Sequence, residues 1–183
     1  MSLASTEDHY GAVARLLHWS IALVIIVLLA TGMGSDLLPK PAGIMFHKAL
    51  GIIALGLGLA RLAWWAFDRV RPRDAGPRLR IIVAKSTAGM LALLGVVMPT
   101  TGWLLSSAAG KPISMFGLFI LPPLLAPDKP LAHLFKETHE TIGTVILGLV
   151  ALHIAGALFH RFILKDDVVF RMLPSCCKPK EQS

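Results

Sequence analysis

Four long apolar runs dominate the sequence and limit what the chain can fold into. Each is about as long as the roughly 20 residues that a helix needs to cross the hydrocarbon core of a bilayer. They extend from about Leu16 to Met33, Phe46 to Phe67, Ile81 to Leu105 and Thr138 to Leu164. Pro99 lies inside the third run, and a membrane helix tolerates it where neighbours satisfy the freed carbonyl. The pattern predicts an all-α fold, an integral membrane four-helix bundle.

Little sequence is left outside these runs. Hydrophobic residues make up 55% of the 183 residues, charged residues 16%, and the mean hydropathy is +0.67. A soluble domain has roughly 25% charged residues and could not bury so much apolar surface at this length. The composition therefore excludes an ordinary soluble enzyme, a disordered chain and a disulfide scaffold. We expect a single membrane domain over residues 1–183.

The first run also has features of a secretory signal, because Arg15 precedes it and Ala30, Thr31 and Gly32 end it. His18 and Trp19 open the run, however, and three more apolar runs follow. We therefore expect it to be retained as a membrane helix.

The basic residues are divided unevenly between the two sides of the predicted bundle. The formal charge is +7. Most of the Lys and Arg residues belong to one side, namely Arg15, Arg61, Arg69, Arg71, Arg73, Arg78, Arg80, Lys85, Arg161, Lys165, Arg171, Lys178 and Lys180. The other side has Lys40, Lys48, Lys111, Lys129 and Lys136. Because Lys and Arg collect in cytoplasmic loops, we expect both termini in the cytoplasm. No groove-reading motif accompanies the charge, so we expect membrane lipid and no nucleic acid as a partner.

Cys176 and Cys177 are adjacent in the predicted cytoplasmic tail. Disulfides are disfavoured in that compartment, and the sequence has no C-x-x-C-H haem-attachment motif. We interpret the two cysteines as incidental thiols.

Four histidines fall at two depths of the predicted bundle. His139 and His153 are 14 residues apart on one helix, which corresponds to a rise of about 21 Å and a return to within roughly 40° of the same face. His18 lies at the depth of His153, and His47 at the depth of His139. Singly, each is typical of a helix-packing or interfacial histidine. Together they predict the pairs His18/His153 and His47/His139, which is the arrangement that would hold two porphyrins inside a bundle.

Small and basic residues follow the same helix faces. Gly51 and Gly58 lie after His47 on nearly its face, Gly143 follows His139 by one turn, and Gly32 falls at the depth of His47. These glycines would leave room for a flat macrocycle, although small residues also serve ordinary helix packing in lipid. Arg61 lies at the depth of the His18/His153 pair, and Arg15 lies at the membrane edge, three residues before His18. Both could pair with haem propionates, and snorkelling to the interface is the alternative.

Other metals and roles fit the pattern less well. A closed zinc site needs four N or S ligands close together, which histidines about 21 Å apart cannot supply. A proton or ion pathway stays open, since histidines relay protons, but Glu137 and Glu140 only flank the fourth run. The remaining histidines, His9, His133 and His160, are assigned to no ligand position.

Five segments in a fixed order resemble the bacterial cytochrome b561 family. They are ARLLHW (14–19), MFHKALGI (45–52), GWLLSSAAGKPISMFGLFILPPL (102–124), HETIGTVILGLVALH (139–153) and FHRFILKDDVVFRMLP (159–174). The resemblance implies a bacterial inner (plasma) membrane cytochrome with two haem b groups. It implies iron ligation by His18, His47, His139 and His153. Relatives often carry histidines near the start of the third helix, where this chain has AKSTAGM (84–90) with Lys85.

The best-defined activity of that family is superoxide oxidase, which oxidises superoxide at the periplasmic face and passes the electron to ubiquinone. Bis-imidazole ligation leaves no open iron position and suits electron transfer, so we assign no catalytic residue. The lysines of the outer side could steer a small anion, and the alternative is that they are solvated surface lysines without a role. The alternative function is an electron-transfer cytochrome b subunit of a partner dehydrogenase or hydrogenase. A third class of function, which would need no haem, is a histidine-lined transporter or a structural membrane protein.

Overall fold

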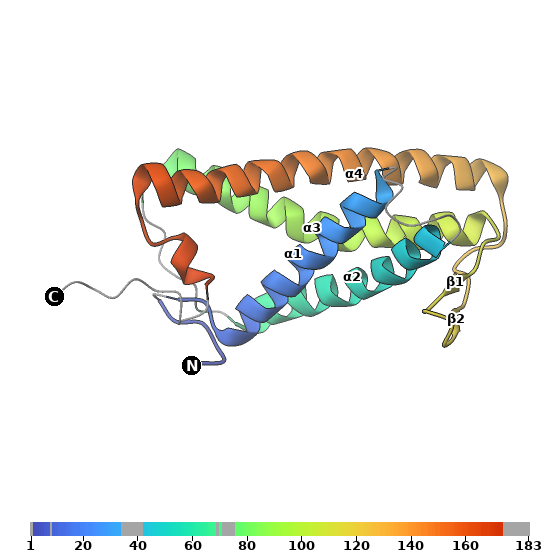
Figure 1. Ribbon diagram of the computed structural model, residues 1–183, viewed down its shortest axis with the longest axis horizontal. Coiled ribbons are helices and arrows are strands. Elements are labelled where there is room, and N and C mark those ends of the chain that lie inside the picture. Colours follow the sequence, from blue (N-terminus) through green and yellow to red (C-terminus); the bar gives the residue numbers. More distant parts are fainter. Residues whose placement is uncertain (1, 8, 34–41, 69, 71–75, 174–183) are drawn as a thin grey trace.

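Helices account for most of the chain in the computed structural model, which describes residues 2–7, 9–33, 42–68, 70 and 76–173 (Figure 1). The long helices are α1 (Ala12–Gly32), α2 (Ala42–Phe67), α3 (Arg78–Ala108) and α4 (Lys129–Leu158). A π-helical segment, η1 (Phe159–Leu164), continues α4, and a short 3₁₀ turn, η2 (Val169–Arg171), follows it. The strands β1 (Ile113–Ser114) and β2 (Ile120–Leu121) form one antiparallel hairpin between α3 and α4.

The four predicted helices are confirmed, and each is long and apolar enough to cross a membrane. The largest difference in bounds is at α4, which begins at Lys129 instead of near Thr138. The first turns of α4 are too polar to be recognised as part of an apolar run, but the start of the helix has a good N-cap. The Asp128 carboxylate accepts a hydrogen bond from the Leu131 N–H at 2.9 Å, and a proline follows in the first turn.

The helices pack in sequence order. The close backbone contacts join α1 to α2, α2 to α3 and α3 to α4. Pro99 cannot donate to the Gly95 carbonyl one turn earlier, and that carbonyl lies against Gly58 of α2. A Cβ at Gly58 would come within 3.0 Å of the Gly95 oxygen. Gly58 therefore lets α2 approach the proline-containing part of α3.

The buried apolar core is small. Among the described residues, its members are Ile21, Ala49, Ala54, Ala108, Ile113 and Ile146. Large apolar side chains such as Leu23, Leu59, Leu93 and Leu152 are exposed along all four helices. Such exposure is too extensive for a soluble domain and is what the hydrocarbon of a bilayer covers.

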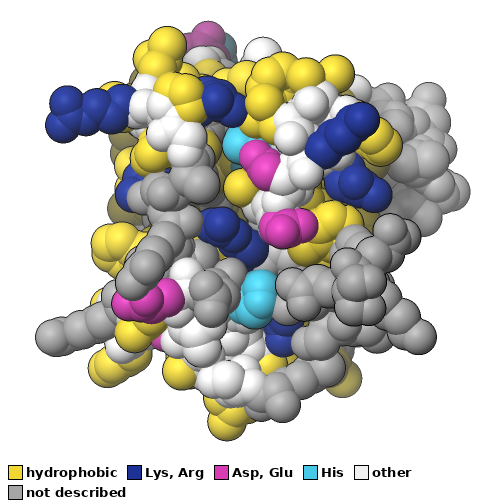
Figure 2. All heavy atoms as spheres, turned by 90° about the vertical axis from the view of Figure 1, so that its left-hand side faces the viewer, with side chains coloured by type: hydrophobic (Ala, Val, Ile, Leu, Met, Phe, Trp, Pro, Cys, Tyr) yellow, Lys and Arg dark blue, Asp and Glu magenta, His cyan; other side chains and the backbone are white. Residues whose placement is uncertain are grey.

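One end of the bundle carries the N-terminal segment, η1, η2, the last turn of α2 and the first turn of α3, and we call it the terminal end (Figure 1). The Asp68 carboxylate accepts hydrogen bonds from the Ser5 N–H at 3.2 Å and from the Ser5 hydroxyl at 2.5 Å. At Gly11 a Cβ would clash with the Leu3 carbonyl oxygen, so only glycine permits this close turn. Lys and Arg side chains are spread over this end (Figure 2).

The other end carries β1, β2 and the first turns of α2 and α4, and we call it the hairpin end (Figure 1). The Ser106 hydroxyl donates to the Lys111 carbonyl at 2.6 Å, and the Leu124 N–H donates to the Ser107 hydroxyl at 3.0 Å. Both serines are buried. They tie the segment after α3 to the end of that helix and fix the hairpin over the bundle.

Candidate cofactor site: two pairs of facing histidines

The first pair of facing histidines lies toward the terminal end. His18 of α1 and His153 of α4 have ring centroids 6.1 Å apart, with the ring planes at 60°. We call them the terminal-end pair. The helix register that predicted a common depth for these residues thus places their rings next to each other.

The second pair lies toward the hairpin end. His47 of α2 and His139 of α4 have ring centroids 6.3 Å apart, with the planes at 76°. We call them the hairpin-end pair. Because His139 and His153 belong to the same helix, the two pairs are separated along α4 by about 21 Å of helix rise.

Both pairs connect helices other than those whose backbones pack most closely. Backbone packing runs α1 to α2 to α3 to α4, whereas the rings join α1 to α4 and α2 to α4. A metal–imidazole bond of about 2 Å on each side, plus about 1 Å from each nitrogen to its ring centre, gives a centroid separation of about 6 Å. The spacing of both pairs therefore fits two imidazoles on opposite sides of one metal ion.

Threonine and glycine support each ring of the hairpin-end pair. Thr31 Oγ1 of α1 is 3.0 Å from His47 Nδ1, and Thr101 Oγ1 of α3 is 3.0 Å from His139 Nδ1. A Cβ at Gly32 would lie 2.9 Å from His47 Cε1, and a Cβ at Gly102 would lie 3.0 Å from His139 Cε1. Sequence reasoning included Gly32 but missed Gly102. The repeated Thr-Gly dipeptide was the signal that could have found it.

The other glycines expected on histidine faces have different surroundings. A Cβ at Gly51 would meet no atom within 4 Å, so the helix face beside His47 is open there. Gly58 lies against α3, in agreement with the helix-packing interpretation. Gly143 approaches the Met98 side chain, where a Cβ would be 3.3 Å from Cε.

Arg61 is the charged residue of the terminal-end pair. Its guanidinium is close enough to interact electrostatically with both His18 and His153. One turn further along α2, the indole N–H of Trp64 is buried and has no acceptor among the described residues. An arginine and an unpaired N–H donor in neighbouring turns fit an anionic group such as a haem propionate.

Arg15 contacts the C-terminal segment instead of the histidines. Its guanidinium donates to the Leu173 carbonyl at 3.1 Å, and the Trp19 indole donates to the Met172 carbonyl at 2.9 Å. These bonds fix the segment after η2 against the start of α1.

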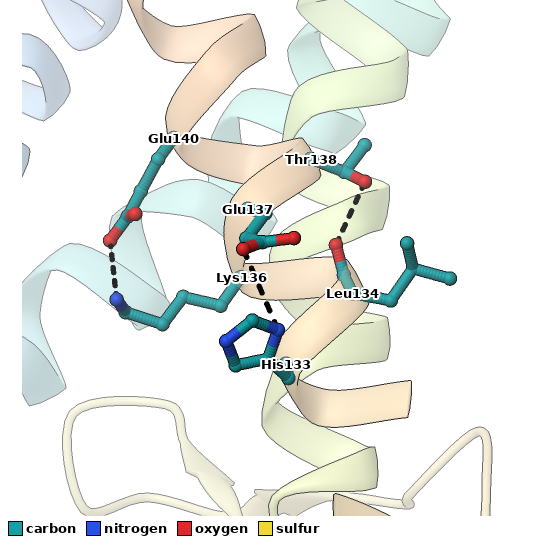
Figure 3. Close-up of polar contacts among 6 residues, drawn as sticks. All are labelled: His133, Leu134, Lys136, Glu137, Thr138 and Glu140. Carbon is teal, nitrogen blue, oxygen red and sulfur yellow. Dashed lines mark hydrogen bonds and ion pairs between the residues drawn. The ribbon is translucent and has the colours of Figure 1, made fainter. Parts of the chain in front are cut away.

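The remaining histidines have carboxylate partners or lie in the tail. At the hairpin end, His133 Nδ1 is 3.6 Å from a Glu137 oxygen on the exposed surface of α4 (Figure 3). At the terminal end, His160 Nδ1 is 2.7 Å from an Asp166 oxygen. His9 belongs to the N-terminal segment. In the described part of the chain, no three His, Cys, Asp or Glu side chains converge on one point, so no closed zinc site forms there.

The lysines of the hairpin end differ in their neighbours. Lys136 pairs with Glu140 at 3.2 Å (Figure 3). Lys48, next to His47, is close enough to Lys111 for electrostatic repulsion. The Lys48 and Lys111 ammonium groups thus form a positive patch at the hairpin end. Lys40, Cys176 and Cys177 lie outside the described residues.

The donor set indicates the chemistry that the site can perform. Two facing imidazoles would hold one planar metal complex between them, and the chemistry that such a complex would supply is one-electron transfer. The described residues at these rings provide no nucleophile paired with a base. The arrangement therefore suits one-electron transfer between two sites within the membrane.

Comparison with known proteins gives a consistent result. The family model described as prokaryotic cytochrome b561 matches residues 9–175. The chain is 31% identical over 180 residues to cytochrome b561 homolog 2 of Escherichia coli (strain K12). The matched region covers 94% of this chain and 95% of that protein. It is 26% identical over 162 residues to probable superoxide oxidase CybB of Yersinia pestis, covering 86% and 92% of the two chains. A match to cytochrome b561 homolog 1 of Escherichia coli is 35% identical over 85 residues, covering 46% and 48%.

Proposed function

The chain belongs to the prokaryotic cytochrome b561 family of membrane electron-transfer proteins that bind b-type haem, and from this premise we propose that it binds two haems, one at each histidine pair. The observation that carries this proposal is the pair of ring separations, 6.1 Å and 6.3 Å, at two levels of α4. A b-type haem held by the two imidazoles of a pair would supply reversible one-electron transfer.

The residues around the pairs have distinct roles in this proposal. His18 and His153 would hold the haem of the terminal end, with Arg61 placed to neutralise its propionates. His47 and His139 would hold the haem of the hairpin end. The open face at Gly51 leaves room beside His47 for a flat ring.

We further propose that the terminal end faces the cytoplasm of a bacterial inner membrane. Support comes from the Lys and Arg residues of the terminal end, since cytoplasmic segments are enriched in these residues. In this orientation the Lys48 and Lys111 patch faces the periplasm.

The proposed reaction is the oxidation of superoxide at the hairpin end and the reduction of ubiquinone. Two superoxide anions each lose one electron and leave as dioxygen, while one ubiquinone takes up two electrons and two protons to give ubiquinol. Similarity to a relative named probable superoxide oxidase supports this substrate. The positive patch of Lys48 and Lys111 supports an anionic substrate, because a local positive field raises the rate at which an anion encounters the protein.

A superoxide pulse on the purified holoprotein tests the function. With ubiquinone present and no other protein, we expect rapid haem reduction followed by ubiquinol formation, both abolished by superoxide dismutase. His139→Ala should abolish ubiquinol formation. His133→Ala, a change on the exposed surface of the same helix, should leave it intact and serves as the matched control.

Two outcomes would support a different function. Haem that stays oxidised after the pulse, together with a copurifying dehydrogenase or hydrogenase that reduces it, would make the chain an electron-transfer subunit. A purified protein without low-spin b-haem absorption would remove both redox functions and leave a transporter or structural role.

A further inference from the structure

The two histidines of the hairpin-end pair are supported in the same way by different helices. Thr31 and Gly32 of α1 contact His47 of α2, and Thr101 and Gly102 of α3 contact His139 of α4. In each case the threonine hydroxyl meets Nδ1 and the missing glycine side chain makes room for Cε1. We call these two dipeptides the Thr-Gly cradles.

The hydrogen bonds of each threonine determine which histidine nitrogen carries the proton. A hydroxyl has one proton to donate and two lone pairs with which to accept. Thr31 Oγ1 is 2.9 Å from the Val27 carbonyl oxygen, and Thr101 Oγ1 is 2.7 Å from the Met98 carbonyl oxygen. Because a carbonyl can only accept, each hydroxyl proton is used in that bond. Each histidine Nδ1 must therefore be the donor toward its threonine.

This assignment leaves Nε2 of both rings with its lone pair available for a metal. A ligating histidine whose other N–H donates to an acceptor is a more basic ligand with a fixed ring orientation. A more basic ligand stabilises the more positively charged, oxidised metal. The cradles therefore lower the reduction potential of a metal bound at the hairpin-end pair.

The terminal-end pair has the opposite environment. Among the described residues, the rings of His18 and His153 have no hydrogen-bonded partner comparable to the cradle threonines. The Arg61 cation interacts electrostatically with both rings. A positive charge near a metal favours its reduced state and raises its reduction potential.

We propose that the Thr-Gly cradles make the hairpin-end haem the lower-potential site of the protein, so that electrons flow downhill from the hairpin end to the terminal end. This inference rests on the proposed binding of one haem at each pair. It identifies Thr31 and Thr101 as positioning residues that act through His47 and His139.

Redox titration of the holoprotein, followed by optical absorption, tests the inference. Thr31→Val and Thr101→Val remove the hydroxyl at nearly constant volume, whereas Thr31→Ser and Thr101→Ser keep it. We expect the valine variants to shift the lower midpoint potential upward and to leave the upper one unchanged. The serine variants should titrate like the wild type.

A single-haem background assigns each potential to its site. In His153→Ala, which retains the hairpin-end pair, the remaining wave should be the lower one and should move upward with Thr101→Val. In His47→Ala, which retains the terminal-end pair, the remaining wave should be the upper one and should not respond to Thr101→Val.

If a valine variant loses its haem, the wild type still allows a test. The measurement is redox-difference infrared spectroscopy of wild-type protein with labelled histidine. The signal of histidine with a hydrogen-bonded Nδ1–H should accompany the lower-potential wave. Its appearance with the upper wave, or valine variants with unchanged potentials, would overturn the inference while leaving two-haem binding intact. A wild type without two bis-imidazole haems would overturn the proposed function itself.

Discussion

Three glycines of α2 have surroundings that assign them different roles. Gly51 follows His47 by one turn and is about 40° from it around the helix, whereas Gly56 is about 180° away. A Cβ at either position would meet no protein atom within 4 Å. Gly58, by contrast, is in contact with the Gly95 carbonyl of α3. Of these three glycines, only Gly51 combines open space with the His47 face of the helix, so it is the one of the three whose small size can make room for a bound macrocycle.

Gly51→Ala should therefore lower the haem content, and Gly56→Ala should not. By helix propensity alone each change favours α2 by about 0.5–1 kcal/mol, so a loss of haem could not be ascribed to a weakened helix. The measurement is the haem-to-protein ratio of the purified variants. Equal, full haem content in both would contradict a cofactor role for Gly51.

The lysines at the hairpin end also divide by their neighbours. Removing Lys48 and Lys111 together, as Lys48→Gln and Lys111→Gln, should lower the rate of superoxide oxidation about tenfold at low salt and weaken its salt dependence. Lys136→Gln is the control, because Lys136 is paired with Glu140 at 3.2 Å and adds little net field. Stopped-flow rates at several ionic strengths give the comparison. An equal loss in the control would exclude a specific patch.

The helices could be predicted from the sequence because apolar runs of membrane-spanning length have few alternative structures. The common depths of the histidines followed from helix rise alone. The cradle contacts could not be predicted in this way, since Thr31 and Thr101 reach rings on neighbouring helices and their placement depends on how those helices pack. The contact of Arg15 with the Leu173 carbonyl likewise depends on where the C-terminal segment returns.

The start of α4 illustrates a local signal that hydropathy misses. Asp128 caps a polar first turn. Asp128→Ala removes this cap and should lower the free energy of unfolding by about 1 kcal/mol. Asp128→Asn removes the charge but keeps the acceptor, so it should cost less. Thermal unfolding in detergent compares the two variants. A larger loss in the asparagine variant would show that charge, and not capping, matters at this position.

The arrangement of the two ends of the bundle predicts how the protein is oriented in the membrane. The N-terminal segment, η1 and η2 share the terminal end, and β1 and β2 occupy the other (Figure 1). Orientation in a membrane follows the distribution of Lys and Arg. The hairpin should therefore face the periplasm, and the tail the cytoplasm.

Thiol labelling in intact cells measures this orientation. A membrane-impermeant reagent should leave the native Cys176 and Cys177 unlabelled until the inner membrane is opened. In a background of Cys176→Ser and Cys177→Ser, Leu118→Cys on the exposed hairpin should be labelled in intact cells. The reverse pattern would invert the proposed path of electrons.

If the bundle holds two haems, each between one facing histidine pair, the two histidines of a pair should be needed for the same haem. Four variants, His18→Ala, His153→Ala, His47→Ala and His139→Ala, should each reduce the haem content from two per chain to about one. The low-temperature absorption spectrum should lose one component in His18→Ala and His153→Ala, and the other component in His47→Ala and His139→Ala. A wild type with a single haem, or a spectrum in which His18→Ala and His47→Ala lose the same component, would contradict the account.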